Sequence, residues 1–319
     1  MTNNLIRSII NITIYIYRHF KLQLMNKKLI LHVGLPKTGS SALQNLLHSN
    51  RDELIQLNIN YPLDDNKRNV KHQSLVKGLF NGNNQSLKTF LDTNKSETLI
   101  LSTEGLTNHL YDYCPKALSK FRDLTINYET TICLVIRNKE KWLKSYYSQS
   151  IINPKIRLDY NATSLKLNEF KKLSRITKLL NTKQLTQDLQ KAYGAHEIVT
   201  IDYSPKFVKE FCFKFIIPYT EVENKKINIT PNSWTIELIR QINGFNLNEQ
   251  QRKSWKAAIQ QFSQTKHNLL AQYEYESTQT LAKEKIILAS LTPVDSLEFP
   301  LTEEIINKFK LFLNSFDRN

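Results

Sequence analysis

Residues 28–47 read KLILHVGLPKTGSSALQNLL, and this stretch decides the fold prediction. The apolar run from Lys28 to Gly34 has the length and composition of a buried strand. From Ser41 to Leu57 the leucines recur at helical spacing, at positions 43, 46, 47, 54 and 57. The glycine-bearing segment 34–41 therefore connects a strand to the start of a helix, which is the unit from which parallel α/β sheets are built.

The alternation of strands and helices continues downstream. Three more apolar runs predict strands, namely ETLILS at 97–102, TTICLVI at 130–136 and EIVTI at 197–201. Helical patterns occupy the intervals, at 69–80, 115–124, 139–151 and 164–192. Strands that alternate with helices indicate a parallel sheet covered on both faces. We therefore expect an α/β three-layer sandwich with a central parallel sheet.

Beyond Pro231 the pattern becomes purely helical, with candidate helices at 233–242, 249–288 and 303–316. The chain has no internal repeat and no Pro- or Ser-rich linker. These features favour a single domain over residues 25–319 that ends in a helical C-terminal portion.

Residues 1–24 differ from the rest. The apolar stretch from Ser8 to Tyr17 is ten residues long, whereas a membrane-spanning helix needs roughly 20. It lacks the small-residue cleavage site of a secretory signal. A basic interfacial anchor, an ordinary buried element and an upstream extension before a start at Met25 all remain open. We treat 1–24 as an N-terminal extension of uncertain status.

Composition restricts the partners and the compartment. The chain has 44 Lys and Arg against 29 Asp and Glu, a net charge of +15, which favours an anionic partner. Its 40% hydrophobic content is enough for a sizeable core. The three cysteines, Cys114, Cys133 and Cys212, are far apart and form no Cys-x-x-Cys pair. This pattern argues against a disulfide framework or a zinc site and suits a reducing cytoplasm.

The loop at 34–41 (GLPKTGSS) has the composition of an anion-binding loop. A glycine-bearing turn before a helix presents backbone N–H groups to an anion. Lys37 adds a positive charge, and Thr38, Ser40 and Ser41 add hydroxyl donors. A nucleoside-triphosphate P-loop has its lysine after the second glycine, whereas Lys37 precedes Gly39. A plain turn with a solvated lysine is the alternative.

A second candidate anion contact follows the strand at 130–136. Arg137 stands where that strand ends, and Ser145 follows eight residues later on the next predicted helix. An arginine can bind a phosphate through two parallel hydrogen bonds, and a serine two helical turns on can add a donor.

At this point a resemblance to a known family becomes specific. HVGLPKTGSSALQNLL resembles the 5′-phosphosulfate loop of PAPS-dependent sulfotransferases, particularly the bacterial carbohydrate-type branch, although Gln44 comes one residue sooner than in that pattern. VIRNKEKWLKSYYSQ is similar to the family's 3′-phosphate motif, an arginine followed eight residues on by a serine before an aromatic pair. The match covers mainly residues 28–150. It implies a P-loop-like fold and PAPS (3′-phosphoadenosine 5′-phosphosulfate) as the sulfuryl donor.

The resemblance also implies roles for individual residues. The residues that would bind the 5′-phosphosulfate are Lys37, Thr38, Gly39, Ser40 and Ser41, and those that would bind the 3′-phosphate are Arg137 and Ser145. In such a reaction Lys37 would neutralise the charge that develops on the leaving oxygen. No metal is expected, because the sequence offers no convincing cluster of metal ligands.

The general base is sought among residues that follow the strands. Glu104 comes directly after the strand at 97–102, and several glycan-type members of the family use a glutamate in this role. A carboxylate that pairs with Lys37 or caps the next helix is the alternative reading. His72 and His109 are the next candidates for the base. Tyr203, after the strand at 197–201, could lie near the adenine.

The sequence thus predicts in-line sulfuryl transfer to a hydroxyl, or less readily an amine, of a carbohydrate or glycolipid acceptor. Two other hypotheses stay open: a P-loop-type phosphotransferase that uses Mg²⁺ and a nucleoside triphosphate, and a non-enzymatic basic protein that binds nucleic acid or a membrane surface. No nucleic-acid-binding module is recognisable, so nucleic acid is not expected as a partner. We expect a cytoplasmic protein, with peripheral contact to the inner membrane face as an option.

Overall fold

The computed structural model describes residues 27–64, 70–154, 161–219, 231, 233–245, 248–253 and 256–257. The chain separates into two compact units, Met1–Thr230 and Pro231–Asn319, and each is described by itself. The predicted extension 1–24, the predicted helix 303–316 and most of the one predicted over 249–288 lie outside the described residues.

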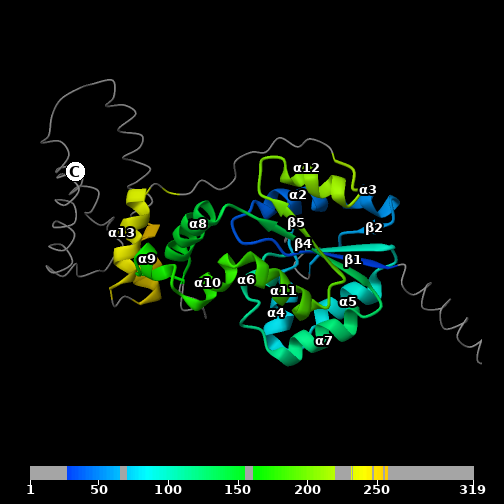
Figure 1. Cartoon of the computed structure of the whole chain (residues 1–319), viewed down its shortest axis with the longest axis horizontal. Helices are drawn as coiled ribbons and strands as arrows, with labels where there is room; N and C mark the ends of the chain where they lie inside the picture. Colours follow the sequence, from blue (N-terminus) through cyan, green and yellow to red (C-terminus); the bar gives the residue numbers. More distant parts are fainter. Residues whose placement is uncertain are drawn as a thin grey trace, which may run out of the picture. The chain divides into compact units, whose positions relative to one another are not determined.

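The first unit is built on a five-stranded, all-parallel sheet with the order β2-β3-β1-β4-β5 (Figure 1). The strands are β1 (Lys28–His32), β2 (Ile59–Asn60), β3 (Thr98–Ser102), β4 (Glu129–Ile136) and β5 (Glu197–Asp202). Four of them were predicted, and β2 is too short to show a period of its own. β1 is central, and its last residue, His32, is in register with Ser102 of β3 and Cys133 of β4.

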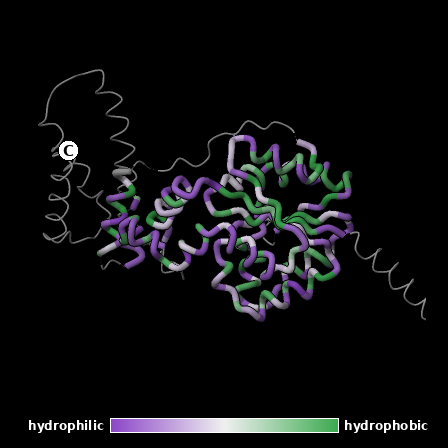
Figure 2. The backbone as a smooth tube through the Cα atoms, viewed as in Figure 1, coloured by the Kyte–Doolittle hydropathy of each residue, from purple (hydrophilic) through white to green (hydrophobic). Residues whose placement is uncertain are grey.

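The core has two parts because side chains alternate along each strand. Leu29 and Leu31 belong to one hydrophobic cluster, whereas Ile30 between them belongs to the other. The first cluster packs against α4 (Gln73–Asn81), α5 (Gln85–Thr93), α7 (Pro115–Thr125) and α11 (Thr182–Tyr193), and the second against α2 (Ser40–Ser49), α3 (Arg51–Gln56) and α12 (Phe207–Lys214). The strands form a largely hydrophobic band between these helices (Figure 2). The arrangement is the predicted three-layer α/β sandwich.

The helix predictions need correction at their boundaries. The pattern over 41–57 divides into α2 and α3 at Asn50, and the long pattern over 164–192 divides into α9 (Leu167–Phe170), α10 (Ser174–Leu180) and α11. Asn181 shows the reason, because its side chain accepts a hydrogen bond from the Gln184 N–H (3.3 Å) and so starts a new helix. Helical spacing continues across such caps. α5, α6 (Gly105–Asn108) and α12 were not predicted.

Helix α8 (Lys139–Ile152) begins directly after β4. Its N-cap, Asn138, accepts a hydrogen bond from the Lys141 N–H (3.1 Å), and Trp142, Tyr146 and Ile151 are buried. Trp142 and Tyr146 stack in the core with ring centroids 4.9 Å apart.

The second unit contributes α13 (Ser233–Asn243) to the described residues, and Leu238, Ile239 and Ile242 are buried there. This helix lies within the predicted helical C-terminal portion. In the part of the chain that the structure describes, no helix combines the length and the apolar character needed to cross a membrane.

Candidate functional site

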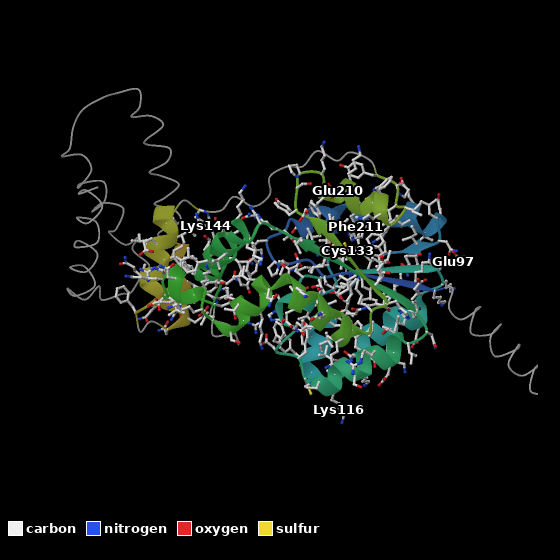
Figure 3. The ribbon with its side chains drawn as sticks, in the orientation of Figure 1. Glu97, Lys116, Cys133, Lys144, Glu210 and Phe211 are labelled. Atoms are coloured by element: carbon white, nitrogen blue, oxygen red, sulfur yellow. The ribbon has the colours of Figure 1, made fainter. Side chains whose placement is uncertain are left out.

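The predicted site residues follow the carboxyl ends of neighbouring strands. The loop 34–41 follows β1, Glu104 follows β3, Arg137 follows β4 and Tyr203 follows β5. Ligands of open parallel sheets bind along this edge. Figure 3 shows Glu97, which precedes β3, and Lys144 of α8 at opposite ends of the sheet. The site lies at the end of the sheet nearer to Lys144.

The carbonyl groups of the loop are engaged by protein donors. Thr38 Oγ1 donates to the Leu35 carbonyl (2.5 Å), and Trp142 Nε1 donates to the carbonyl of Pro36 (2.8 Å). Arg137 Nη1 donates to the carbonyl of Lys37 (3.1 Å). These three bonds hold the loop in place through its backbone carbonyl groups.

The N–H groups of the loop are, by contrast, available. Within the described residues, no acceptor contacts the N–H groups of residues 37–41, and α2 starts at Ser40 without a side-chain cap. Ser40 is 3% exposed, and its Oγ has no partner among these residues. Free N–H groups at a helix N-terminus attract anions through both hydrogen bonding and the helix dipole. Such an arrangement can bind an anion, and anion binding by this loop stays a prediction.

Gly39 allows the loop to pack closely against Tyr203 and Phe207. Its φ of +74° lies in the left-handed region, and a Cβ there would stand 2.8 Å from Cε2 of Tyr203 and 3.1 Å from Cε1 of Phe207. Lys37 also has a positive φ, of 66°. A lysine rarely adopts this conformation, and such strain clusters at functional sites.

Lys37 and Arg137 are close enough for their positive charges to interact. The Arg137 guanidinium carbon lies 4.9 Å from the centre of the Tyr203 ring, which is 39% exposed. The pKa of the Lys37 amine is lowered by burial and by the charge of Arg137. No carboxylate forms an ion pair with either cation in the described segments. An anion between the two would relieve their repulsion and supply the missing partner.

Ser145 lies on α8 three residues after Trp142, so the two side chains are neighbours on the helix surface. Trp142 contacts the loop through Pro36, and Tyr146 donates to Asn108 Oδ1 of α6 (2.5 Å). The helix that carries Ser145 is therefore fixed to the loop and to the segment after Glu104. Ser145 itself is partly exposed.

Glu104 is the N-cap residue of α6, but its carboxylate does not cap that helix. Glu104 Oε2 instead accepts a weak hydrogen bond from Gln44 Nε2 of α2 (3.4 Å). No ion pair joins Glu104 to Lys37 in the described residues. Neither of the alternative readings of this carboxylate describes its contacts.

The two histidines proposed as alternative bases have other partners. Nδ1 of His72 accepts from the Ser102 N–H (2.9 Å), and Nε2 lies 2.9 Å from the Pro62 carbonyl, so both nitrogens of this buried ring bind backbone. His109 Nδ1 lies 3.4 Å from Asp112 Oδ2, and Asp112 also pairs with Arg175.

The chain matches no known protein-family model and none of the curated proteins with which it was compared. Among the described residues, no three His, Cys, Asp or Glu side chains are grouped so that they could hold a metal ion.

Sequence reasoning missed a buried polar group beside the loop, formed by His32, Gln44 and Ser102. Each is at most 1% exposed. Ser102 Oγ lies 2.7 Å from His32 Nδ1 and accepts from Gln44 Nε2 (3.1 Å). The available signal was the polar residue that ends each of the two apolar strands, since β1 ends in His32 and β3 in Ser102.

Proposed function

We propose that this chain is a P-loop-like, PAPS-dependent sulfotransferase. One observation carries the proposal: among the described residues, a loop with free N–H groups, two cations without a carboxylate partner and a carboxylate that accepts a 3.4 Å hydrogen bond from Gln44 occur together at one sheet edge. The unpartnered Ser40 Oγ fits an oxyanion in the loop, because a hydroxyl can donate to a phosphate or sulfate oxygen.

The residues have distinct tasks in this reaction. PAPS supplies an electrophilic sulfuryl group linked through oxygen to its 5′-phosphate. The N–H groups of 37–41 hold the 5′-phosphosulfate, and Lys37 stabilises the charge on the oxygen that leaves with the nucleotide. Arg137 and Ser145 bind the 3′-phosphate. Tyr203 offers an exposed ring for the adenine beside Arg137.

Glu104 is the proposed general base. It takes the proton of the acceptor hydroxyl while the new O–S bond forms and the S–O bond to the phosphate breaks. The products are a sulfate ester, adenosine 3′,5′-bisphosphate and a protonated Glu104. The backbone contacts of His72 favour Glu104 over that histidine, because a ring bonded at both nitrogens has no lone pair free for a substrate proton.

The acceptor is proposed to be a carbohydrate or glycolipid hydroxyl, or less readily an amine. The net charge of +15 suits an acceptor that is already anionic. A cytoplasmic location, with peripheral contact to the membrane where the acceptor is a glycolipid, agrees with the scattered cysteines.

The phosphotransferase hypothesis ranks second. It would use the loop for a nucleoside triphosphate and Glu104 for Mg²⁺. It gives Arg137 and Ser145 no 3′-phosphate to bind. A purely electrostatic binding role would not require a left-handed Lys37 or a sealed polar group behind the loop.

Calorimetry with adenosine 3′,5′-bisphosphate tests the proposal. We expect the wild type to bind it, Lys37→Ala to weaken binding at least tenfold, and Lys116→Ala to bind as the wild type does. Lys116 is an exposed lysine of α7 and serves as the matched control (Figure 3). Tight binding of ATP with Mg²⁺ and no binding of the bisphosphate would overturn the proposal in favour of a phosphotransferase.

The role of Glu104 has its own test. Glu104→Gln should bind the bisphosphate normally but lose turnover, measured as bisphosphate released from PAPS in the presence of a panel of glycans. Retained turnover would move the role of the base to another group.

A further inference from the structure

A buried chain of hydrogen bonds leads from Glu104 back to the strand that carries the loop. Gln44 Nε2 lies 3.4 Å from Glu104 Oε2 and 3.1 Å from Ser102 Oγ, and Ser102 Oγ lies 2.7 Å from His32 Nδ1. Gln44, Ser102 and His32 are at most 1% exposed. The chain crosses from α2 through β3 to β1, three elements that all end or begin at the site.

The direction of each bond follows from the chemistry of its members. Glu104 as a carboxylate only accepts, so the Gln44 amide must present its NH₂ group to it. The same NH₂ group faces Ser102 Oγ, which therefore accepts from Gln44. The single hydroxyl hydrogen of Ser102 can then donate to His32 Nδ1 at 2.7 Å. The other acceptor beside it in the described residues is the Tyr61 hydroxyl, whose own hydrogen goes to the Val70 carbonyl.

This direction determines the state of His32. Burial lowers the pKa of its ring to about 4, against the opposing effect of the Glu104 charge, so the ring is neutral near pH 7. A neutral imidazole has one N–H. With the Ser102 hydrogen directed to Nδ1, the ring hydrogen resides on Nε2.

The Nε2–H of His32 faces the loop. Nε2 is buried without a partner among the described residues, and so is Oγ of Ser40. Both flank the hydrogen that Gly34 carries in place of a side chain: a Cβ there would lie 3.3 Å from His32 Nε2, 2.9 Å from Ser40 Oγ and 3.2 Å from Thr38 Oγ1. His32 Nε2 and Ser40 Oγ do not bond to one another in the structure, since neither has a partner among the residues that it describes. A hydrogen bond between them is therefore expected to form only when an anion occupies the loop.

The geometry points to His32 as a positioning residue that joins the anion loop to Glu104 through one polarised hydrogen-bond chain. With an anion in the loop, an anion oxygen accepts from Ser40 Oγ and Ser40 accepts from His32 Nε2, while His32 accepts from Ser102 and Ser102 accepts from Gln44. The second hydrogen of the Gln44 amide holds Glu104. This inference rests on the proposed function for the identity of the anion and for the role of Glu104.

Two consequences follow for the site. The Ser40 hydroxyl can only donate to the ligand, so the adjacent ligand oxygen must be an acceptor, as the oxygens of a sulfuryl or ionised phosphoryl group are. Chains of hydrogen bonds strengthen one another. Occupation of the loop therefore tightens the Gln44–Glu104 contact from its present 3.4 Å and orients the carboxylate.

NMR on the ¹⁵N-labelled full-length protein tests the chain without an acceptor substrate. At pH 7.5 the His32 ring should be neutral with its hydrogen on Nε2. Saturation with inorganic phosphate or adenosine 3′,5′-bisphosphate should shift both this resonance and the Gln44 side-chain amide. A hydrogen on Nδ1, with Ser102 donating elsewhere, or a Gln44 amide that does not respond to a bound ligand, would overturn the inference.

Variants locate the link. His32→Asn keeps an acceptor near Ser102 but removes the Nε2 donor, so at saturating ligand the Gln44 amide should no longer shift. Gly34→Ala, whose Cβ would enter between His32 and Ser40, should have the same effect and provides a second case if His32→Asn fails to fold. The matched control is His196→Asn, because His196 contacts the start of β4 at the opposite edge of the sheet. A Gln44 shift that survives in both His32→Asn and Gly34→Ala would contradict the proposal.

The two ligands separate the inference from the proposed function. If inorganic phosphate binds and shifts the Gln44 amide resonance while the bisphosphate does not bind, the inference of the hydrogen-bond chain stands and the sulfotransferase proposal fails. If the bisphosphate binds but Gln44 does not respond, the sulfotransferase proposal stands and the chain fails. Absence of binding by both ligands overturns both.

Discussion

Replacement of Arg137 by alanine tests how the site binds its nucleotide. Arg137 makes two contacts on the protein side, a hydrogen bond to the Lys37 carbonyl (3.1 Å) and a cation–π contact with Tyr203 (4.9 Å). In the proposed complex its remaining donors bind the 3′-phosphate. Arg137→Ala therefore removes a loop contact that every nucleotide needs and a phosphate contact that only 3′-phosphorylated nucleotides use.

The expected losses differ between ligands. A charge-assisted hydrogen bond to phosphate contributes roughly 1.5–3 kcal/mol, and the bond to the Lys37 carbonyl about 1 kcal/mol. With a tenfold change in affinity per 1.4 kcal/mol, Arg137→Ala should weaken adenosine 3′,5′-bisphosphate roughly 60- to 700-fold. Adenosine 5′-monophosphate, which lacks the 3′-phosphate, should lose only about fivefold.

Isothermal calorimetry measures both ligands on the wild type, Arg137→Ala and Arg137→Lys. Arg137→Lys retains the charge but not the planar fork, so it should recover only part of the bisphosphate affinity. Equal losses for the two ligands would refute the reasoning, because Arg137 would then act only on the loop. An unchanged bisphosphate affinity would remove Arg137 from the site.

Three further predictions concern the framework of the site. Gly39→Ala should lower the free energy of unfolding in urea by more than Gly82→Ala does. Both glycines have a positive φ, which costs an alanine about 1 kcal/mol, but of the two only Gly39 would place a Cβ against Tyr203. Equal losses would contradict the packing argument. His32 has a pKa of about 4 in the folded protein, so below about pH 6.5 its ring takes up a proton in the unfolded state but stays neutral in the folded state. The free energy of unfolding should therefore fall by about 3 kcal/mol as the pH is lowered from about 6.5 to about 4. Urea titrations across this range should show a steeper loss for the wild type than for His32→Asn, and parallel curves would count against a buried neutral ring. Trp142→Phe removes the 2.8 Å hydrogen bond to the Pro36 carbonyl of the loop and should lower the free energy of unfolding by about 1–3 kcal/mol. It should also weaken bisphosphate binding. Wild-type affinity in calorimetry would show that α8 does not support the loop in binding.

The sequence predicted the elements that have a period of their own. The apolar runs of β1, β3, β4 and β5 are long enough to be recognised, and their alternation with helical patterns implied a parallel sheet. The two residues of β2 show no period, and a cap such as Asn181 interrupts a helix without breaking its spacing. Boundaries were therefore less well predicted than the presence of the elements.

The same distinction applies to the candidate site. The local order of residues in 34–41 indicated an anion loop, because backbone N–H groups and a helix start are supplied by adjacent residues. That Glu104 and Arg137 lie at the same edge followed from parallel strands. Which groups are engaged could not be read from the chain, because partners such as Arg137 and the Lys37 carbonyl are a hundred residues apart in sequence.

Sequence alone thus determined the fold class and the residue types offered to an anion, since both depend on neighbours within a few positions. Only the tertiary structure showed that His32, Ser102 and Gln44 form a buried chain that reaches Glu104. These residues come from β1, β3 and α2, and their hydrogen bonds depend on strand register and on the packing of α2 over the sheet. A polar side chain sealed in the core acquires its role from the partners that the fold brings to it.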